Sequence, residues 1–193
     1  MKGMILLAPH FEDTEAIVTM DLIKRAGIEV DAISVVESLD LTTQYGLSIR
    51  ADKSYRDIEI AQYDFVVLPG GKAVFETHLS SVVTQNIIRH FSENRQLIAA
   101  ICAAPGVLGQ MGLLQGLPYT CFPSCEKYGK DGIYQENQSV VVTDAMITAQ
   151  AAGATFLFAY EIIKKIKGEQ VARAVLDSIY YFPYSTGEKN ENQ

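Results

Sequence analysis

The sequence predicts an open α/β fold, in which helices cover both faces of a mostly parallel sheet. Apolar runs of strand length at residues 4–8, 64–68 and 97–101 alternate with segments whose apolar residues recur at helical spacing. These runs are apolar at nearly every position, which is typical of strands covered on both faces. With 193 residues, of which 48% are hydrophobic, the chain can bury a core as one domain.

The first part of the chain is expected to form a strand–helix–strand unit followed by a ribbon. After the strand at residues 4–8, an acidic stretch at 12–15 precedes a helix over 16–27, which ends with basic residues and a glycine. Residues 28–34 alternate into a second strand, and such a unit is the building block of a doubly wound sheet. Residues 41–51 are expected to form a short antiparallel ribbon on the sheet edge.

The middle of the chain contains two buried strands that end at chemically distinctive residues. The strand at 64–68 leads to Gly70 and Gly71, where the missing side chains let the backbone approach a ligand closely. The strand at 97–101 ends directly before Cys102.

The remaining elements are expected to complete the sheet and its helical layers. Helical spacing predicts the helices, and short apolar runs predict the strands. Helices are expected at residues 82–91, from 105 onwards, at 153–166 and at 169–176, with short strands at 119–123 and a pair around a turn within 140–149.

The C-terminal end of the sequence changes character. Residues 179–184 are too aromatic to be left in water, so they are expected to cover the domain core or a dimer seam. Residues 186–193 are polar and are expected to be disordered. We therefore expect one domain over residues 1–185 and a polar tail over 186–193.

Composition excludes several classes of function. The net charge is -7, and no long lysine or arginine cluster occurs, so neither nucleic acid nor an anionic membrane surface is an expected partner. The apolar runs are far shorter than the roughly 20 residues of a membrane span. Three cysteines are too few for a disulfide framework, and the N-terminus lacks the pattern of a signal peptide. A reducing, cytoplasmic location is expected.

Cys102 lies at a sharp turn between a strand and a helix. Proline is favoured in the first turn of a helix, so Pro105 places the helix start within about three residues of the sulfur. The N–H groups and dipole at a helix start stabilise an anion, and the thiolate is the nucleophilic form of cysteine. Ala103 and Ala104 leave room for a small substrate or oxidant. The alternative is a buried core thiol, the commonest fate of a free cysteine.

Three features are expected at the edge of the sheet where the strands end. The acidic residues from Glu12 to Glu15, the pair Gly70 and Gly71, and Cys102 each follow a predicted strand. A thiol with a carboxyl group and backbone donors beside it makes a nucleophile site. If Glu15 is buried beside Cys102, its pKa rises and it can donate a hydrogen bond to the sulfur. The alternative is that these acids are ordinary first-turn residues stabilised by the helix dipole.

Five motifs follow one another along the chain in a characteristic order. They are FEDTEA at residues 11–16, DLIKRAG at 21–27, LPGG at 68–71, AAICAAP at 99–105 and a glycine turn with its helix at 148–159. Together they resemble the ThiJ/PfpI superfamily, also called the DJ-one superfamily, and especially its small single-domain branch with the Parkinson-associated protein and YajL. The resemblance covers about residues 3–176.

The resemblance implies a flavodoxin-like, doubly wound sheet of the class I glutamine amidotransferase type, with Cys102 at a strained nucleophile elbow. It implies Glu15 as the protonated partner of the sulfur, and the backbone of Gly70, Gly71 and Ala103 as an oxyanion site. It also implies a homodimer. Activities reported in the superfamily include glyoxalase and deglycase chemistry on dicarbonyls, chaperone activity and peroxide sensing through cysteine-sulfinic acid.

The sequence departs from the superfamily at the position of the histidine base. Ala103 stands where the protease-like branch has a histidine, and Phe122 stands where the Parkinson-associated branch has one before a proline. His10 and His78 lie in loops at the same edge of the sheet and are candidate accessory bases. Peptide-bond cleavage is not expected, because nothing evident would deprotonate water or protonate a leaving amine.

Cys121 and Cys125 form a second pair of chemically distinctive residues. Structural zinc sites have four ligands, and this pair has no second pair or histidines beside it, so no metal or other cofactor is expected. Cys121 directly precedes Phe122. It is therefore a candidate resolving thiol that would trap a Cys102 sulfenic acid as a disulfide.

Three functions remain open from the sequence. The first is a cysteine-dependent enzyme acting on small reactive carbonyls, with Cys102 as nucleophile and Glu15 as proton carrier. The second is an oxidative-stress sensor or chaperone in which peroxide converts Cys102 to a sulfinate. The third is a non-catalytic binding dimer. The expected partners are accordingly a small carbonyl compound or a peroxide and a second copy of the chain.

Overall fold

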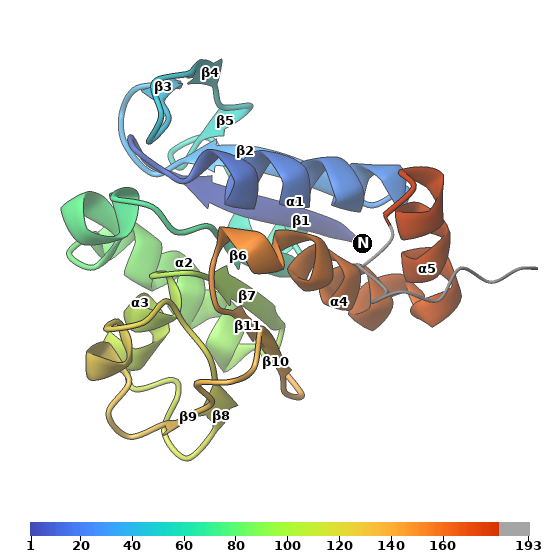
Figure 1. The fold of residues 1–193 in the computed structure, drawn as a ribbon. Helices are drawn as coiled ribbons and strands as arrows, with labels where there is room; N and C mark the ends of the chain where they lie inside the picture. The colour runs from blue at the N-terminus through green and yellow to red at the C-terminus, as the bar shows by residue number, and fades with distance from the viewer. Residues whose placement is uncertain (182–193) are drawn as a thin grey trace, which may run out of the picture.

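Seven strands form one central sheet with the order of a doubly wound α/β fold. The structure, a computed structural model, describes residues 1–181. The strand order is β10-β11-β7-β6-β1-β2-β5, and all neighbours are parallel except β10 and β11. The strands are β1 (Lys2–Leu7), β2 (Glu29–Ser34), β5 (Lys53–Ser54), β6 (Phe65–Leu68), β7 (Leu97–Ile101), β10 (Val140–Val142) and β11 (Met146–Ala149). The predicted fold is confirmed (Figure 1).

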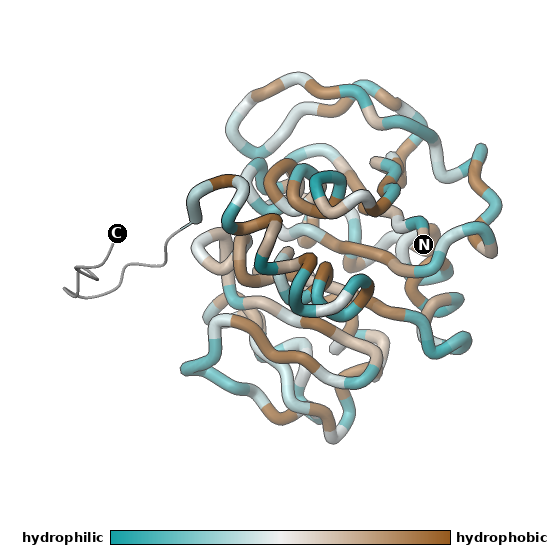
Figure 2. The backbone as a smooth tube through the Cα atoms, turned by 90° about the vertical axis from the view of Figure 1, so that its right-hand side faces the viewer, coloured by the Kyte–Doolittle hydropathy of each residue, from teal (hydrophilic) through white to brown (hydrophobic). Residues whose placement is uncertain are grey.

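The hydrophobic core lies on both faces of this sheet. Every residue of β6 and β7 is buried, as the uninterrupted apolar runs predict. Figure 2 shows apolar stretches running through the middle of the molecule and hydrophilic residues at many of its outer turns. The carboxyl ends of the neighbouring strands β1, β6 and β7 therefore meet at one edge of this buried sheet.

Two helical layers enclose the sheet. Figure 1 shows α1 and α4 on one face and α2 on the other. The helices are α1 (Asp13–Arg25), α2 (Val82–Glu93), α3 (Pro105–Gln110), α4 (Thr155–Lys167) and α5 (Glu169–Ser178). The first of them begins earlier than predicted, because the Glu12 side chain accepts the N–H of Glu15 at 2.7 Å and caps the helix.

A hairpin outside the main sheet corresponds to the predicted ribbon. The strands β3 (Asp40–Thr42) and β4 (Ser48–Arg50) pair antiparallel, as expected, but form a sheet of their own. The edge of the main sheet is instead β5, which the sequence analysis missed because it is only two residues long. The hairpin loop is tied to α1, since Thr43 Oγ1 donates to Asp13 Oδ1 at 2.6 Å.

The predicted strand at 119–123 is largely wrong. Only β8 (Pro118–Tyr119) is a strand there, and it pairs in parallel with the unpredicted β9 (Ile133–Tyr134). The chain then turns, because the N–H of Phe122 donates to the carbonyl oxygen of Cys102 at 2.8 Å instead of to a neighbouring strand. The next residue, Pro123, has no N–H to continue a ladder.

Four short helical turns complete the described chain. They are η1 (Ile60–Gln62), η2 (Val74–His78), η3 (Glu126–Tyr128) and η4 (Ala152–Ala154). Of these, η2 is a π-helix that follows the glycine turn after β6. Such wide turns inside or beside helices occur often at functional sites.

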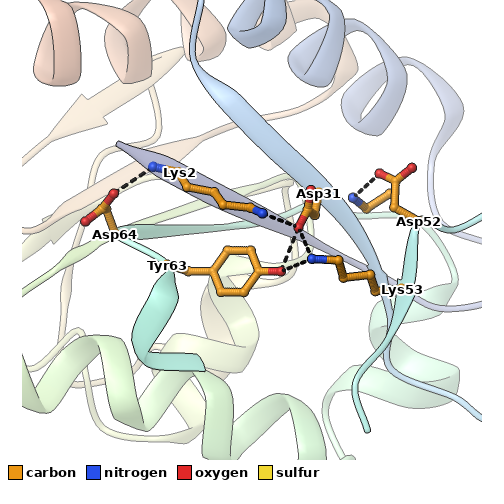
Figure 3. Close-up of polar contacts among 7 residues, drawn as sticks. Lys2, Asp31, Asp52, Lys53, Tyr63 and Asp64 are labelled. Atoms are coloured by element: carbon orange, nitrogen blue, oxygen red, sulfur yellow. Dashed lines mark hydrogen bonds and ion pairs between the residues drawn. The ribbon is translucent and has the colours of Figure 1, made fainter. Parts of the chain in front are cut away.

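A cluster of charged side chains around the partly buried Asp31 links β1, β2 and β5 (Figure 3). Asp31 Oδ2 accepts hydrogen bonds from Lys2 Nζ at 2.9 Å, from Lys53 Nζ at 2.9 Å and from Tyr63 Oη at 2.7 Å. Burial acts to raise the pKa of Asp31, but these hydrogen bonds outweigh it and lower the pKa to about 2. The carboxylate is therefore charged at neutral pH and joins the strands across the sheet.

The C-terminal predictions fall partly outside the described residues. Tyr181 stacks on Phe156 of α4, with ring centroids 4.9 Å apart, whereas Tyr180 is largely exposed. The rest of the predicted aromatic segment, the polar tail at 186–193 and the domain boundary at residue 185 lie beyond residue 181. No helix within residues 1–181 is long and apolar enough to cross a membrane.

Candidate active site around Cys102

The backbone at Cys102 has a conformation that few residues other than glycine adopt. Its φ is 65°, in the left-handed region, directly after β7 ends at Ile101. Such a conformation costs on the order of 1–3 kcal/mol. Two hydrogen bonds hold it: the Cys102 N–H donates to Ala149 O at 2.9 Å, and Cys102 O accepts from Phe122 N–H. The sharp elbow that the resemblance implied is therefore present.

Glu15 enters the site from the first turn of α1. Its side chain is fully buried, and Oε2 accepts the N–H of Gly70 at 2.8 Å. The carboxyl group also lies beside the Cys102 side chain, since both face the same point at Gly70. Within residues 1–181 the second oxygen, Oε1, is buried without a hydrogen-bond partner, which favours a protonated carboxyl group. Burial, followed by the charge of Glu12, raises the pKa of Glu15 to about 7.

The glycine turn after β6 brings the carboxyl group and the thiol together. A Cβ atom at Gly70 would lie 2.6 Å from Cys102 Cβ and 2.7 Å from Glu15 Oε2, so no larger residue fits. Gly71 has a φ of 91°, and a Cβ atom there would lie 2.5 Å from the backbone nitrogen of Glu12. Close approach of three backbone segments therefore requires both glycines.

Opposing effects act on the pKa of the Cys102 thiol. Burial raises its pKa above the ordinary range, and the charge of Glu15 acts in the same direction. Hydrogen bonds from the N–H groups of Ala103 and Gly71 act to lower the pKa. The expected gain from a helix N-terminus is outweighed, because α3 has only six residues and the sulfur is largely removed from water. Since ionisation of either group disfavours ionisation of the other, the pair titrates as a unit.

The thiol lines a cavity of about 340 Å³. Glu12, Glu15, Gly71 and Ala103 line it beside Cys102. Its other walls come from the hairpin loop, the start of η2, the loop after β8 and the turn before α4. The side chains are Gln44, Tyr45, Lys72, Phe75, Phe122 and the two alanines at 151 and 152.

Most of the site residues predicted from the sequence meet at this cavity. Glu15, Gly71, Ala103 and Phe122 line it with Cys102, and Gly70 lies directly behind the thiol and the carboxyl group. The candidate resolving thiol Cys121 is fully buried and does not line the cavity.

Neither candidate histidine lies at the cavity. His10 is exposed, and its Nδ1 lies 2.6 Å from Glu76 Oε2. His78 is fully buried with Nδ1 3.0 Å from Thr84 Oγ1, and burial lowers its pKa to about 4. Within residues 1–181 no histidine therefore lines the cavity beside the thiol.

Several cavity residues were missed by the sequence analysis. Lys72 and Phe75 directly follow the glycine turn, where the absence of a further glycine already indicated a different cavity wall, although no role was assigned to either residue. Gln44 and Tyr45 could not be predicted, because only the folded hairpin brings them over the site. There the Lys72 N–H donates to Gln44 Oε1 at 2.9 Å, and the Tyr45 N–H donates to Asp13 Oδ2 at 3.3 Å.

The described residues offer no site built for a metal ion. Within residues 1–181 no group of three or more histidine, cysteine, aspartate or glutamate side chains is arranged to hold one. The chemistry that the cavity can support from its own residues is nucleophilic addition by sulfur, proton transfer by Glu15 and anion stabilisation by the two N–H groups.

Comparison with known proteins gives consistent matches over nearly the whole chain. The model of the DJ-1/PfpI family matches residues 1–165. Protein dj-1beta of Drosophila melanogaster is 30% identical over 175 residues, which cover 90% of this chain and 94% of the fly protein.

Solved structures match equally well. The DJ-1 superfamily protein STM1931 of Salmonella typhimurium, solved as a cysteine-to-alanine mutant, is 31% identical with a TM-score of 0.89, covering 95% of this chain and 99% of that one. A structure described as oxidized DJ-1 of Toxoplasma gondii is 28% identical with a TM-score of 0.88, covering 93% and 98% of the two chains.

Proposed function

Because the chain belongs to the DJ-1/PfpI family, we propose that it performs cysteine-dependent chemistry on small reactive carbonyl compounds, of the glyoxalase or deglycase type. The observation that carries this proposal is the position of the buried Glu15 carboxyl group beside the Cys102 thiol, both of them against Gly70. A base whose pKa lies near neutral pH is suited to take a proton at that pH and return it later. With a pKa of about 7, Glu15 fits this requirement.

The first step is addition of the sulfur to an aldehyde carbon. A bond forms between Cys102 Sγ and that carbon, the carbonyl π bond breaks, and the thiol proton passes to the Glu15 carboxylate. The negative charge that develops on oxygen is stabilised by the N–H groups of Gly71 and Ala103, which already donate toward the sulfur. Return of the proton from Glu15 gives a neutral hemithioacetal.

A 2-oxoaldehyde then completes an internal rearrangement. Glu15 removes the proton on the carbon bonded to sulfur, and reprotonation of the neighbouring carbon converts the hemithioacetal into a thioester of a 2-hydroxy acid. Water hydrolyses the thioester and releases the acid and the thiol. The net change is addition of one water molecule to the 2-oxoaldehyde, so no external oxidant or reductant is required.

The same residues argue against peptide cleavage. Expulsion of an amine requires a proton donor on the leaving nitrogen. Phe122 lines the cavity at the position where the Parkinson-associated branch has a histidine, and neither His10 nor His78 lines it. Chemistry confined to carbonyl addition uses Cys102 and Glu15 alone.

A second candidate function is redox sensing with a protective or chaperone output. Each of two peroxide molecules would transfer one oxygen atom to Cys102 and leave as water or an alcohol, giving first a sulfenic and then a sulfinic acid. The N–H groups of Gly71 and Ala103 and a protonated Glu15 would hold the sulfinate oxygens. One relative was solved in a form described as oxidized, which supports this alternative.

The experiment that tests the proposal is turnover of methylglyoxal, followed by its loss and by the appearance of lactate. The wild type is expected to form lactate, and Cys102→Ser is expected to lose this activity. Cys125→Ser is the matched control, because Cys125 is a buried thiol that does not line the cavity. Absence of turnover in the wild type, or unchanged turnover in Cys102→Ser, would overturn the proposal.

A cytoplasmic location is also proposed. Cys102, Cys121 and Cys125 are all free thiols, which fits a compartment that keeps cysteines reduced. Fractionation of cells that express the full chain tests this, and recovery in a membrane or secreted fraction would contradict it.

A further inference from the structure

Three aromatic side chains surround the Cys102 cavity. Tyr45 comes from the hairpin loop, Phe75 from η2 and Phe122 from the loop after β8. All three are unusually exposed for their type, at 73%, 51% and 46%. Exposed aromatic side chains that gather around one cavity mark a binding surface more often than isolated ones do.

Two acceptors in the cavity wall, on Glu12 and Gln44, are occupied by backbone N–H groups of the protein itself. Glu12 Oε2 accepts the N–H of Glu15 at 2.7 Å. Gln44 Oε1 accepts the N–H of Lys72 at 2.9 Å. A hydroxyl-rich ligand, such as a sugar adduct, would have to compete for these acceptors, and an unpaired polar group in the cavity is costly. The apolar part of a ligand does not compete for these acceptors and leaves no polar group of its own unpaired.

The cavity is also large for a compound with a single methyl group. Its volume of about 340 Å³ is that of on the order of ten liquid water molecules. A ketoaldehyde bearing one methyl group would leave much of this space to water. A phenyl ring would displace that water and cover the exposed faces of Phe75 and Phe122, burying apolar surface on both partners.

We propose, building on the carbonyl chemistry proposed above, that the Cys102 cavity selects carbonyl compounds with an aryl group over those with a methyl or a polyhydroxylated chain. Phe75 and Phe122 are the residues that determine this specificity. The reactive carbonyl carbon lies against Cys102 Sγ, and the aryl group lies between the two phenylalanine side chains. Phe122 thus gives the cavity an apolar binding surface at the position where the Parkinson-associated branch has a histidine.

The first measurement is the ratio of kcat/KM for phenylglyoxal to that for methylglyoxal. One methylene in an apolar pocket is worth about tenfold or more in kcat/KM, so the wild type is expected to favour phenylglyoxal by at least that factor. In Phe122→Ala and in Phe75→Ala the ratio is expected to fall about tenfold. Val82→Ala is the matched control, because Val82 is an exposed apolar residue on α2 outside the cavity.

The second measurement does not depend on turnover. Phenacyl bromide and bromoacetone alkylate Cys102, whose sulfur displaces bromide while the thiol proton leaves to Glu15 or water. The two rates, each divided by the rate with free glutathione, give the preference of the cavity itself. The wild type is expected to favour phenacyl bromide about tenfold, and both phenylalanine variants are expected to reduce this preference.

The two measurements separate the two proposals. If neither ketoaldehyde is turned over but alkylation keeps its aryl preference, the carbonyl enzyme is overturned and aryl selection stands. If methylglyoxal is turned over with the same kcat/KM as phenylglyoxal and alkylation shows no preference, aryl selection is overturned. A preference that persists in both phenylalanine variants also overturns it.

Discussion

The protonation state of the Glu15 side chain decides how Cys102 can react. Burial holds its pKa at about 7, so the carboxyl group exchanges a proton near neutral pH. The thiol beside it has a raised pKa, for which burial is the largest cause. Reactivity of the sulfur therefore depends on transfer of its proton to Glu15 rather than on a thiolate that is already present.

This coupling predicts the pH dependence of Cys102 alkylation. In a Cys121→Ser, Cys125→Ser background, the rate with iodoacetamide is expected to rise through about pH 7 as Glu15 loses its proton. In Glu15→Gln that inflection is expected to disappear, and the rate to rise only at higher pH, because the buried thiol must then ionise alone. Mass spectrometry of the alkylated protein gives both profiles. Identical profiles would show that the two groups are not coupled.

The same carboxyl group predicts a pH dependence of stability. The folded state binds the proton of Glu15 more tightly than an ordinary glutamate, whose pKa is 4.5, because the folded pKa is about 7. This stability is fully present below pH 4.5 and is lost as the pH rises through about 7. The difference between the two pKa values corresponds to about 3 kcal/mol.

Glu15→Gln is therefore expected to be more stable than the wild type at pH 8, by up to about 3 kcal/mol, with the advantage vanishing near pH 4. Urea unfolding at both pH values measures the difference in the free energy of unfolding. A variant that is equally destabilised at both pH values would mean that the Gly70 hydrogen bond, rather than charge burial, dominates at this position.

At the scale of elements, the turn after β6 determines the spacing between α1 and the Cys102 elbow. Gly70→Ala is expected to lower the free energy of unfolding by about 1–3 kcal/mol, because a methyl group would overlap Cys102 Cβ and Glu15 Oε2. It should also slow Cys102 alkylation by separating the pair. Gly153→Ala is the control, since a Cβ atom there has no atom within 4 Å. Equal stability of the two variants would contradict this account of the turn.

The elements that the sequence predicted well are those with strong local signals. The strands β6 and β7 are uniformly apolar, and α1 has an acidic start and a basic end, so their positions follow from the chain itself. The strand expected at 119–123 failed because a long-range hydrogen bond, from Phe122 to Cys102, decides the local backbone. Pairing of β8 with β9 likewise joins segments too short to show a pattern.

The candidate site, too, could be predicted only where the sequence carries a local signal. Glu15, Gly70, Gly71 and Cys102 follow strand ends, and in a parallel sheet such ends meet at one edge. Of the aromatic side chains at the cavity, Tyr45 escaped prediction because a separate hairpin carries it there, whereas Phe122 was among the predicted residues. The pKa direction at Cys102 escaped it because the extent of burial cannot be read from neighbours in sequence.

At the scale of the whole molecule, a homodimer remains a prediction of the family resemblance. The hairpin loop and α1 each have an exposed apolar side chain: Leu47 in the hairpin loop is 55% exposed and Ile17 on α1 is 38% exposed. The hairpin loop and α1 are tied together by the hydrogen bond from Thr43 Oγ1 to Asp13 Oδ1. Exposed apolar side chains such as these suit burial against a second copy of the chain.

Analytical ultracentrifugation is expected to give twice the mass of one chain for the wild type. Ile17→Glu and Leu47→Glu are expected to shift the protein to the monomer, because a buried unpaired charge opposes association. Val82→Glu, which places the same charge on the exposed surface of α2, should remain dimeric. A monomeric wild type would contradict the prediction.

The bond from the Cys102 N–H to Ala149 O has a consequence for synthesis of the protein. The elbow is held by a residue that the ribosome adds long after the cysteine itself. At roughly 5–20 residues per second, the nascent chain spends several seconds with Cys102 made but Ala149 not yet made. During that interval Cys102 lacks the hydrogen bond that holds its backbone. The site is complete only after β11 has emerged from the ribosome.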